Sequence, residues 1–280
     1  MKTIKTTLLF CLISVFSFAE VSVNQKTALV DLYNATNGES WSRTWDLNEP
    51  VSTWFGVTIE NLNVVELNLS FNELQGSLPE SISYLTSLKV LNLSFNKIEG
   101  ELPKTLKDLS RLEELKLFSN SFTGSIPKSI GELNNLRVLE LFNNYFTGEI
   151  PLSIGRLSKL ETLILSSNLL IGKLPSTISK LESLKVLSVF DNNLLGIIPP
   201  SIGKLKELEE LVLANNAFFG NLPNELTQLT KLKTLLISNN QFKGNYVAII
   251  DKLPNLVNID IDIKNPKGAL ATLDIQDDDD

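Results

Sequence analysis

The chain of 280 residues contains no histidine, one methionine and one cysteine, Cys11. Histidine is the commonest general base, a cysteine thiolate is a usual nucleophile, and both residues are the usual ligands of zinc. Their scarcity argues against these kinds of catalytic and metal site. A protein with a single cysteine also has no intrachain disulfide, so we expect the fold to depend on the burial of apolar side chains.

Basic residues are too few to balance the acidic ones. The chain has 25 lysines and arginines against 32 aspartates and glutamates, a net charge of −7. This argues against nucleic acid as a partner, because its binding requires basic stripes that neutralise phosphates. Long apolar runs are also missing. The apolar run LLFCLISVFSF near the N-terminus is too short to span a bilayer, so we expect no transmembrane segment.

That run belongs to a stretch with the layout of a secretory signal peptide. MKTIKTTLLFCLISVFSFAE has two lysines, an apolar segment and then Ser17-Phe18-Ala19, which predicts cleavage after Ala19. The alternatives are a lipoprotein anchored through Cys11, although Phe10 occupies the place of a small residue, and a buried N-terminal strand or helix. We therefore expect residues 1–19 to be a signal peptide, and the protein to be secreted or loosely associated with the cell surface.

The rest of the chain is a repeat array with a period of 24 residues. Apolar residues fill the spaces between three residue types that keep one register. Asparagine recurs at Asn72, Asn96, Asn120, Asn144, Asn168, Asn192, Asn216 and Asn240, glycine at Gly76, Gly100, Gly124, Gly148, Gly172, Gly196, Gly220 and Gly244, and proline at Pro79, Pro103, Pro127, Pro151, Pro175, Pro199 and Pro223.

One repeat reads LxxLxLxxNxLxGxIPxxIxxLxx. The alternating LxL segment predicts a short strand with one face inward. The asparagine that follows can hydrogen-bond to buried turn amides of the neighbouring repeat. Glycine permits a backbone conformation that a side chain would forbid, and proline fixes the chain at the start of a short helical return. No single repeat could be stable alone, so neighbouring repeats must share a core.

This pattern resembles the leucine-rich repeat, in particular the plant-type subclass with its G-x-[IL]-P signature, over about Val64 to Ile261. The resemblance implies a right-handed α/β solenoid with a parallel sheet on the concave face and short helical or 3-10 segments on the convex face. We expect a helical N-terminal cap over residues 20–63, eight repeats of 24 residues over 64–255, and a C-terminal strand and cap with an acidic tail over 256–280.

The N-terminal cap is expected to cover the first strand. Residues 21–37 carry apolar residues at helical spacing, with Asn24 as a candidate N-cap, and the three tryptophans of the chain follow. WFGVTIENLNVVELNLS resembles the caps of plant-type repeat proteins, where a W-x-G-V motif lies between paired cysteines. Ser52 and Ile59 occupy those cysteine positions, and the ALVDLYNATNGESW segment resembles secreted bacterial members of the Bacteroidetes type.

Candidate binding residues are the outward positions of the predicted strands. In several repeats these positions are apolar or aromatic and have charged neighbours, a composition common in association surfaces. The alternative for Phe142 and its equivalents is packing over the turn on a neighbouring repeat, as also for Phe71 and Phe95. The predicted ligand-binding set is Glu114, Lys116, Phe118, Val138, Glu140, Phe142, Ile164, Val186, Phe190, Val212 and Leu236.

The sequence therefore predicts a secreted recognition module without enzymatic activity or a cofactor, which binds a protein or peptide on its concave face. A preformed curved surface lowers the ordering cost of binding. Glu114 and Glu140 could form a glycosidase-like pair on adjacent strands, but acidic residues on a solvated face are the ordinary case. The alternatives are binding of an extracellular polysaccharide and a structural or adhesive surface component. An ice-binding face would need a more regular threonine or asparagine array.

Overall fold

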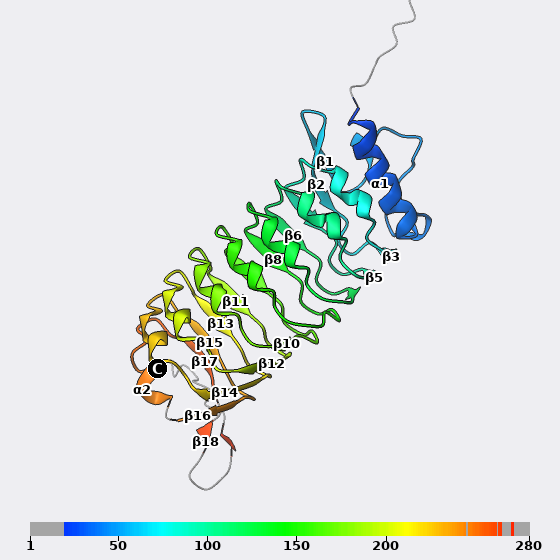
Figure 1. Cartoon of the computed structure of the whole chain (residues 1–280). Helices are drawn as coiled ribbons and strands as arrows, with labels where there is room; N and C mark the ends of the chain where they lie inside the picture. The colour runs from blue at the N-terminus through cyan, green and yellow to red at the C-terminus, as the bar shows by residue number, and fades with distance from the viewer. Residues whose placement is uncertain (1–19, 245, 262, 265–269, 272–280) are drawn as a thin grey trace, which may run out of the picture.

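The protein is a right-handed solenoid of stacked repeats with a helix at its N-terminal end (Figure 1). The computed structural model describes residues 20–244, 246–261, 263–264 and 270–271. The predicted signal peptide, residues 1–19, and the acidic tail, residues 277–280, lie outside the described residues. Helix α1 (Val23–Ala35) and the 3-10 helices η1 (Gly38–Ser40) and η2 (Val51–Thr53) precede the first repeat.

The main sheet has ten strands, and their order in space follows their order in the chain. β1 is antiparallel to β2, and each later pair is parallel with a register of one repeat, as in Leu115↔Leu139 and Leu139↔Leu163. The strands are β1 (Val57–Glu60), β2 (Asn63–Asn68), β4 (Val90–Asn92), β6 (Glu114–Lys116), β8 (Val138–Glu140), β9 (Thr162–Ile164), β11 (Val186–Ser188), β13 (Glu210–Val212), β15 (Thr234–Leu236) and β17 (Asn258–Asp260).

Most repeats continue from their strand through a turn to a second short strand and a 3-10 helix, and in the repeat of β8 this segment forms only isolated bridges at Thr147 and Glu149. The recurring glycine of this segment is left-handed, with φ of 73° at Gly148, and the proline stands directly before the 3-10 helix. Two further parallel sheets run along this side of the solenoid: β3 (Gln75–Ser77), β5 (Lys97–Gly100) and β7 (Ser121–Phe122) in one, and β10 (Ile171–Gly172), β12 (Asn193–Gly196), β14 (Ala217–Asn221) and β16 (Gln241–Lys243) in the other.

The 3-10 helices form the side of the solenoid opposite the main sheet, so the predicted fold class is confirmed. They are η3 (Glu80–Tyr84), η4 (Lys104–Asp108), η5 (Lys128–Glu132), η6 (Leu152–Arg156), η7 (Ser176–Lys180), η8 (Pro200–Lys204) and η9 (Asn224–Gln228). The last described elements are α2 (Val247–Ile250), β18 (Ile263–Lys264) and β19 (Leu270–Ala271).

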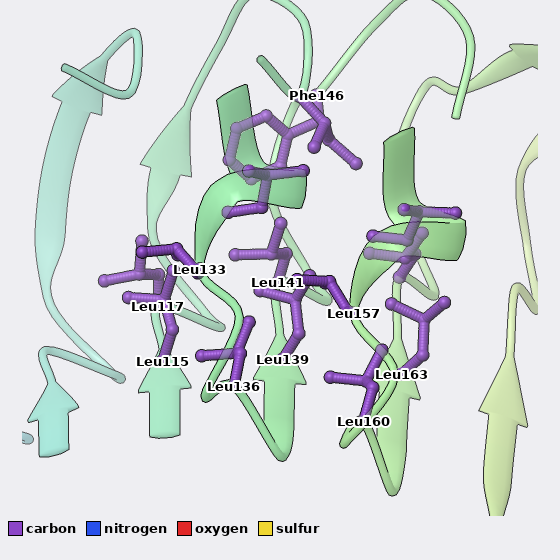
Figure 2. Close-up of a cluster of buried hydrophobic side chains, with 14 of the residues drawn as sticks. Leu115, Leu117, Leu133, Leu136, Leu139, Leu141, Phe146, Leu157, Leu160 and Leu163 are labelled. Atoms are coloured by element: carbon purple, nitrogen blue, oxygen red, sulfur yellow. The ribbon is translucent and has the colours of Figure 1, made fainter. Parts of the chain in front are cut away.

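An aliphatic core fills the space between the sheet and the 3-10 helices (Figure 2). Equivalent leucines of successive strands, such as Leu115, Leu139 and Leu163, point into it and are fully buried. Each side chain contributes about 1.5–3 kcal/mol, mostly through contacts with its own and adjacent repeats. In one repeat the buried set is Leu136, Leu139, Leu141, Phe146, Ile150, Ile154 and Leu157.

The recurring asparagines connect neighbouring repeats by hydrogen bonds. Asn144 accepts a bond from the backbone amide of Phe122, one repeat earlier, at 3.0 Å. Its side-chain amide donates to the carbonyls of Leu117 at 3.0 Å and Leu141 at 3.1 Å. Asn168 repeats the arrangement by accepting from the amide of Phe146. The predicted role of these asparagines is confirmed, because buried backbone groups that face away from water need such partners.

The N-terminal cap is held together by aromatic packing. Trp41, Trp45 and Trp54 are buried, and the ring centroids of Trp45 lie 4.8 Å and 4.7 Å from those of Trp41 and Trp54. Each indole N–H donates to a backbone carbonyl, as that of Trp45 does to Phe55 at 2.9 Å. This cluster covers the end of the leucine core without a disulfide.

The prediction of Asn24 as the N-cap of the first helix is wrong. Helix α1 starts at Val23, and the preceding Ser22 has an extended backbone and accepts a bond from the amide of Gln25 at 3.4 Å. Asn24 lies inside the first turn. Serine and asparagine have similar N-cap preferences, and Ser22 lies only two residues before Asn24.

A row of alternating charges runs along the amino-terminal ends of the strands of the main sheet. We call it the edge charge ladder. Lys185 and Glu161 form an ion pair of 2.6 Å, Lys233 and Glu209 one of 2.7 Å, and Arg137 also pairs with Glu161. Opposite charges on adjacent strands favour each other. The ladder comprises Lys89, Glu113, Arg137, Glu161, Lys185, Glu209 and Lys233.

Candidate functional site

The concave surface is formed by the residues that flank the buried centre of each strand. In β8, Val138 and Glu140 are half-buried and point outward, while Leu139 between them is buried. The same pattern holds in β6, β9, β13 and β15 for the predicted site residues of those strands. Because neighbouring strands are in register, equivalent outward residues form columns across the sheet.

All eleven predicted site residues lie on this surface, and all are half-buried. Eight lie on strands, and three phenylalanines lie two residues after their strands. Their contact with a ligand stays a prediction. The strand residues are Glu114, Lys116, Val138, Glu140, Ile164, Val186, Val212 and Leu236, and the others are Phe118, Phe142 and Phe190.

Four phenylalanines stack along the N-terminal half of this surface. We call them the phenylalanine ladder: Phe71, Phe95, Phe118 and Phe142. Successive ring centroids are 4.0 Å, 5.1 Å and 4.3 Å apart. Packing on the neighbouring repeat, the alternative considered from the sequence, is therefore real for these rings. They also stay accessible, with 68% of Phe71 and 43% of Phe95 exposed.

The predicted site did not include Phe71 and Phe95 because they occupy a different position in the repeat. Both are left-handed, with φ of 54°, at the position that Ser119 and Asn143 occupy in the next repeats. Phe118 comes one residue earlier in its repeat. The ring of Phe95 lies at 82° to that of Phe118, in an edge-to-face contact that connects the two positions. A 24-residue alignment separates these positions, whereas the fold brings the rings together.

The ladder ends at Phe142 because the next repeat has a serine at that position. Ser166 is followed one repeat later by Phe190, so the two phenylalanines are separated by one small residue. Given the spacing of parallel strands, their positions are about 10 Å apart. The hydroxyls of Ser166 and Ser188 share a hydrogen bond of 2.6 Å. The row of phenylalanines therefore has a gap at Ser166, between the positions of Phe142 and Phe190.

The charges beside this gap are unequal. Lys116 is held by Glu114 in an ion pair of 2.6 Å, so Glu114 is not a free partner for Glu140 in a catalytic pair. Within the described part of the chain, Glu140 itself has no ion pair or hydrogen bond. Burial raises the pKa of Glu140, Glu114 adds to this effect, and Lys116 opposes it. Glu140 is thus a partly desolvated carboxylate without a direct partner among the described residues.

Other kinds of site find little support in the described residues. No group of three potential metal-ligating side chains occurs in the described ranges, and no described helix is long and apolar enough to cross a membrane. The three tryptophans, which could have formed a flat platform for a sugar, are buried in the cap. The partly exposed aromatic side chains of the concave surface are phenylalanines.

A second apolar surface, on the side of the solenoid, was not among the predicted site residues. Ile171, Leu195 and Phe219 lie at equivalent positions of β10, β12 and β14 and are 50%, 43% and 45% exposed. Together with Leu152 and Ile197 they lie at or beside a shallow depression of about 970 Å³. The sequence signal was a run of three apolar residues at a repeat position that otherwise holds glutamine, glutamate, threonine and lysine.

Comparison with known families and proteins agrees with this architecture. The family described as leucine-rich repeat region matches residues 123–271, and the family described as leucine rich repeat matches residues 62–122. No curated protein sequence matches the chain.

The chain is similar to several solved plant receptor structures. It is 33% identical to a chain of the PEPR1–AtPEP1 complex over 85% of its own length, with a TM-score of 0.74. It is 31% identical, over 86% of its length and with a TM-score of 0.77, to a chain of the Arabidopsis receptor kinase HAESA in complex with the peptide hormone IDA and the co-receptor SERK1. A third similar structure is the ectodomain of GASSHO1/SCHENGEN3 from Arabidopsis thaliana in complex with CASPARIAN STRIP INTEGRITY FACTOR 2, with 32% identity over 83% of this chain and a TM-score of 0.74.

The chain covers 34%, 42% and 32% of those three chains, so it corresponds to less than half of each. The two family matches together extend from residue 62 to 271. The parallel strands from β2 to β17 and the asparagine connections agree with them. The chain therefore belongs to the leucine-rich repeat family.

Proposed function

We propose that the protein is a secreted recognition module, without enzymatic activity, that binds a protein or peptide on its concave surface. The observation that supports this most directly is the open face of the main sheet, where Ile164 and Val212 are partly exposed on paired strands and Phe142 is partly exposed two residues after β8. Such a surface loses little conformational freedom on binding. Two of the similar plant structures are complexes with the peptides AtPEP1 and IDA, which agrees with this proposal.

A peptide is favoured over a polysaccharide because of the residue types on the surface. Sugar-binding platforms use exposed tryptophan or tyrosine, whereas this surface presents phenylalanine, valine and isoleucine. The secretion of the protein and its affiliation with bacterial members of the family stay predictions from the sequence.

The proposal is tested by selecting peptides from a random displayed library on the immobilised chain that starts at Glu20. The selected peptides are then measured against a concave variant, Phe142→Ala with Phe190→Ala, and a control on another face, Leu152→Ala. We expect at least about tenfold weaker binding for the concave variant, because two apolar contacts are lost, and unchanged binding for the control. The melting temperature of each variant is measured in parallel.

Peptides that bind both variants equally well would contradict a concave site. A large loss of thermal stability in the concave variant, with no change in binding of the fraction that remains folded, would mean that the two phenylalanines serve packing alone.

A further inference from the structure

The concave surface carries an excess of negative charge. Of the described residues at the two outward positions of each parallel strand and at the second and third positions after it, six are acidic and one is basic. The single base, Lys116, is already paired with Glu114. The basic residues of the edge charge ladder directly precede the strands and are not part of this set. The acidic residues are Glu66, Glu114, Glu140, Asp191, Glu210 and Asp260.

Glu140 is the member of this set with the strongest reason to attract a cation. It is half-buried, has no hydrogen bond or ion pair within the described part of the chain, and is adjacent to Lys116, whose ammonium is taken by Glu114. A partly desolvated carboxylate gains more from a new opposite charge than an exposed one does. Because its pKa is raised by burial, ionised Glu140 is less stable in the free protein than in water, and a cationic partner would relieve this.

The phenylalanines beside Glu140 suit the same kind of group. Phe142 follows Glu140 by two residues on the same surface, and its neighbour on the side of the next repeat is the small Ser166. The positions of Phe142 and Phe190 are about 10 Å apart with only a serine between them, which leaves room for one planar group beside the rings. Aromatic rings favour a guanidinium, which is planar and only weakly hydrated, over a compact ammonium.

The rest of the surface adds a second requirement. From Glu140 on β8, the sheet continues through β9 and β11 to β13, where Val212 and then Leu236 of β15 are outward and half-buried. Three strand spacings amount to about 14 Å. An extended chain covers this distance in about four to five residues. A peptide that contacts both Glu140 and Val212 therefore carries its cationic and apolar side chains about four to five residues apart.

From these observations we propose that the ligand is an extended peptide segment in which an arginine docks beside Glu140, between Phe142 and Phe190, and an apolar residue about four to five positions away docks on Val212 and Leu236. This inference rests on the proposed function and specifies the chemistry of the partner.

The test uses the peptides selected from the random library on the immobilised chain from Glu20. We expect them to be enriched in arginine with an apolar residue about four to five positions away. Glu140→Gln should weaken the best arginine peptide about tenfold, because a charge-assisted contact is lost. A synthetic copy of that peptide with glutamine in place of arginine should bind the parent protein and the Glu140→Gln variant with affinities that differ by less than about twofold.

The matched control is Glu149→Gln, which removes an exposed carboxylate beside the lateral depression and should not change affinity. A second arm replaces arginine by lysine and should lose part of the affinity, because the planar contact with the rings is lost. High salt should weaken the arginine peptide more than the glutamine copy. The melting temperatures of both variants show that they are folded.

Three outcomes would overturn the inference. In the first, the selected peptides have no excess of basic residues but still bind the double phenylalanine variant more weakly. This result would support the proposed function and contradict a basic ligand. Basic peptides that are insensitive to Glu140→Gln would place the cation elsewhere. Peptides insensitive to every concave substitution would contradict the proposed function and, with it, this inference.

Discussion

Two side chains at the turn of each repeat have opposite roles, although they are close in sequence. Asn144 is buried and connects the carbonyls and amides of two repeats, whereas Phe142, two residues earlier, is half-exposed on the concave surface. The first role depends on hydrogen bonds that water cannot supply, and the second depends on surface that water still reaches. The same turn can therefore keep the fold while its outward residue varies.

The asparagine role predicts a specific loss of stability. Asn144→Ala leaves the amide of Phe122 without its hydrogen-bond partner in the core, whereas the carbonyl of Leu117 keeps the bond that it accepts from Asn120. An unsatisfied buried group costs about 1–3 kcal/mol, so we expect the free energy of unfolding in urea to fall by about 1–3 kcal/mol. The control is Asn193→Ala, which removes an exposed amide and should change this free energy by less than about 0.5 kcal/mol. Equal losses in both variants would contradict the special role of the buried position.

For single residues, the repeat register predicts which way a side chain points, but it does not predict which side chains it contacts. It indicated that Phe142 and Glu140 point outward, because alternation along a strand is regular. It could not indicate that Phe95 would bridge to Phe118, since the two lie at different repeat positions and meet only through their side-chain torsions. Nor could it indicate that Lys116 would turn to Glu114 and leave Glu140 alone, because that depends on a choice between two carboxylates.

The edge charge ladder acts between elements. It places one charge directly before each of seven successive strands, and the sign changes from each repeat to the next, from Lys89 to Lys233. Glu161, directly before β9, forms ion pairs with both Arg137 and Lys185, which stand directly before the two neighbouring strands. A shift of one repeat would place like charges on adjacent strands, which is unfavourable. The leucines are the same in every repeat and do not distinguish one strand from another. The alternating charges therefore favour the observed pairing of each strand with its direct neighbours.

This arrangement predicts a pH-dependent contribution from Glu161. Hydrogen bonds from Lys185 and Arg137 hold the pKa of Glu161 below its ordinary value. Its contribution to stability is therefore complete above the unfolded value of about 4.3 and is lost as the pH falls through the lower folded value. Glu161→Gln should lower the melting temperature by about 1–3 °C at neutral pH and by progressively less in acid.

The matched control is Glu113→Gln. Glu113 belongs to the same ladder but has no ion pair among the described residues, so its substitution should leave the melting temperature within about 1 °C of the original at every pH. A difference between Glu161→Gln and the parent protein that persists unchanged in acid would mean that the ion pairs do not cause it.

For the whole molecule, the sequence was most informative where the structure is most regular. The 24-residue period indicated the solenoid, the parallel sheet and the shared leucine core, because each repeat solves the same burial problem. It was least informative at the start of helix α1, where Ser22 rather than Asn24 is the cap. It also did not predict the lateral apolar surface around Leu195, because no rule of burial requires apolar residues there.

A solenoid without disulfides has two ends, and the stability of each end depends on local packing. Because repeats contact mainly their neighbours, a defect in a cap should loosen the nearest repeats first. Trp45→Ala removes the central ring of the cap cluster, which contacts Trp41 and Trp54, and should cost about 3–5 kcal/mol locally. In hydrogen exchange, we expect amides of β2 and β4 to lose protection while those of β13 and β15 keep most of theirs.

The mirror experiment is Leu253→Ala, which removes a buried side chain behind α2 at the other end of the array. It should raise exchange in β15 and β17 and leave β2 protected. If either substitution increased exchange uniformly from β2 to β17, the array would unfold as a single cooperative unit, and nearest-neighbour coupling would not describe this protein. If the two effects stay at opposite ends, the central repeats that carry Glu140, Phe142 and Phe190 form the most stable part of the molecule. A binding surface there keeps its shape while the ends open.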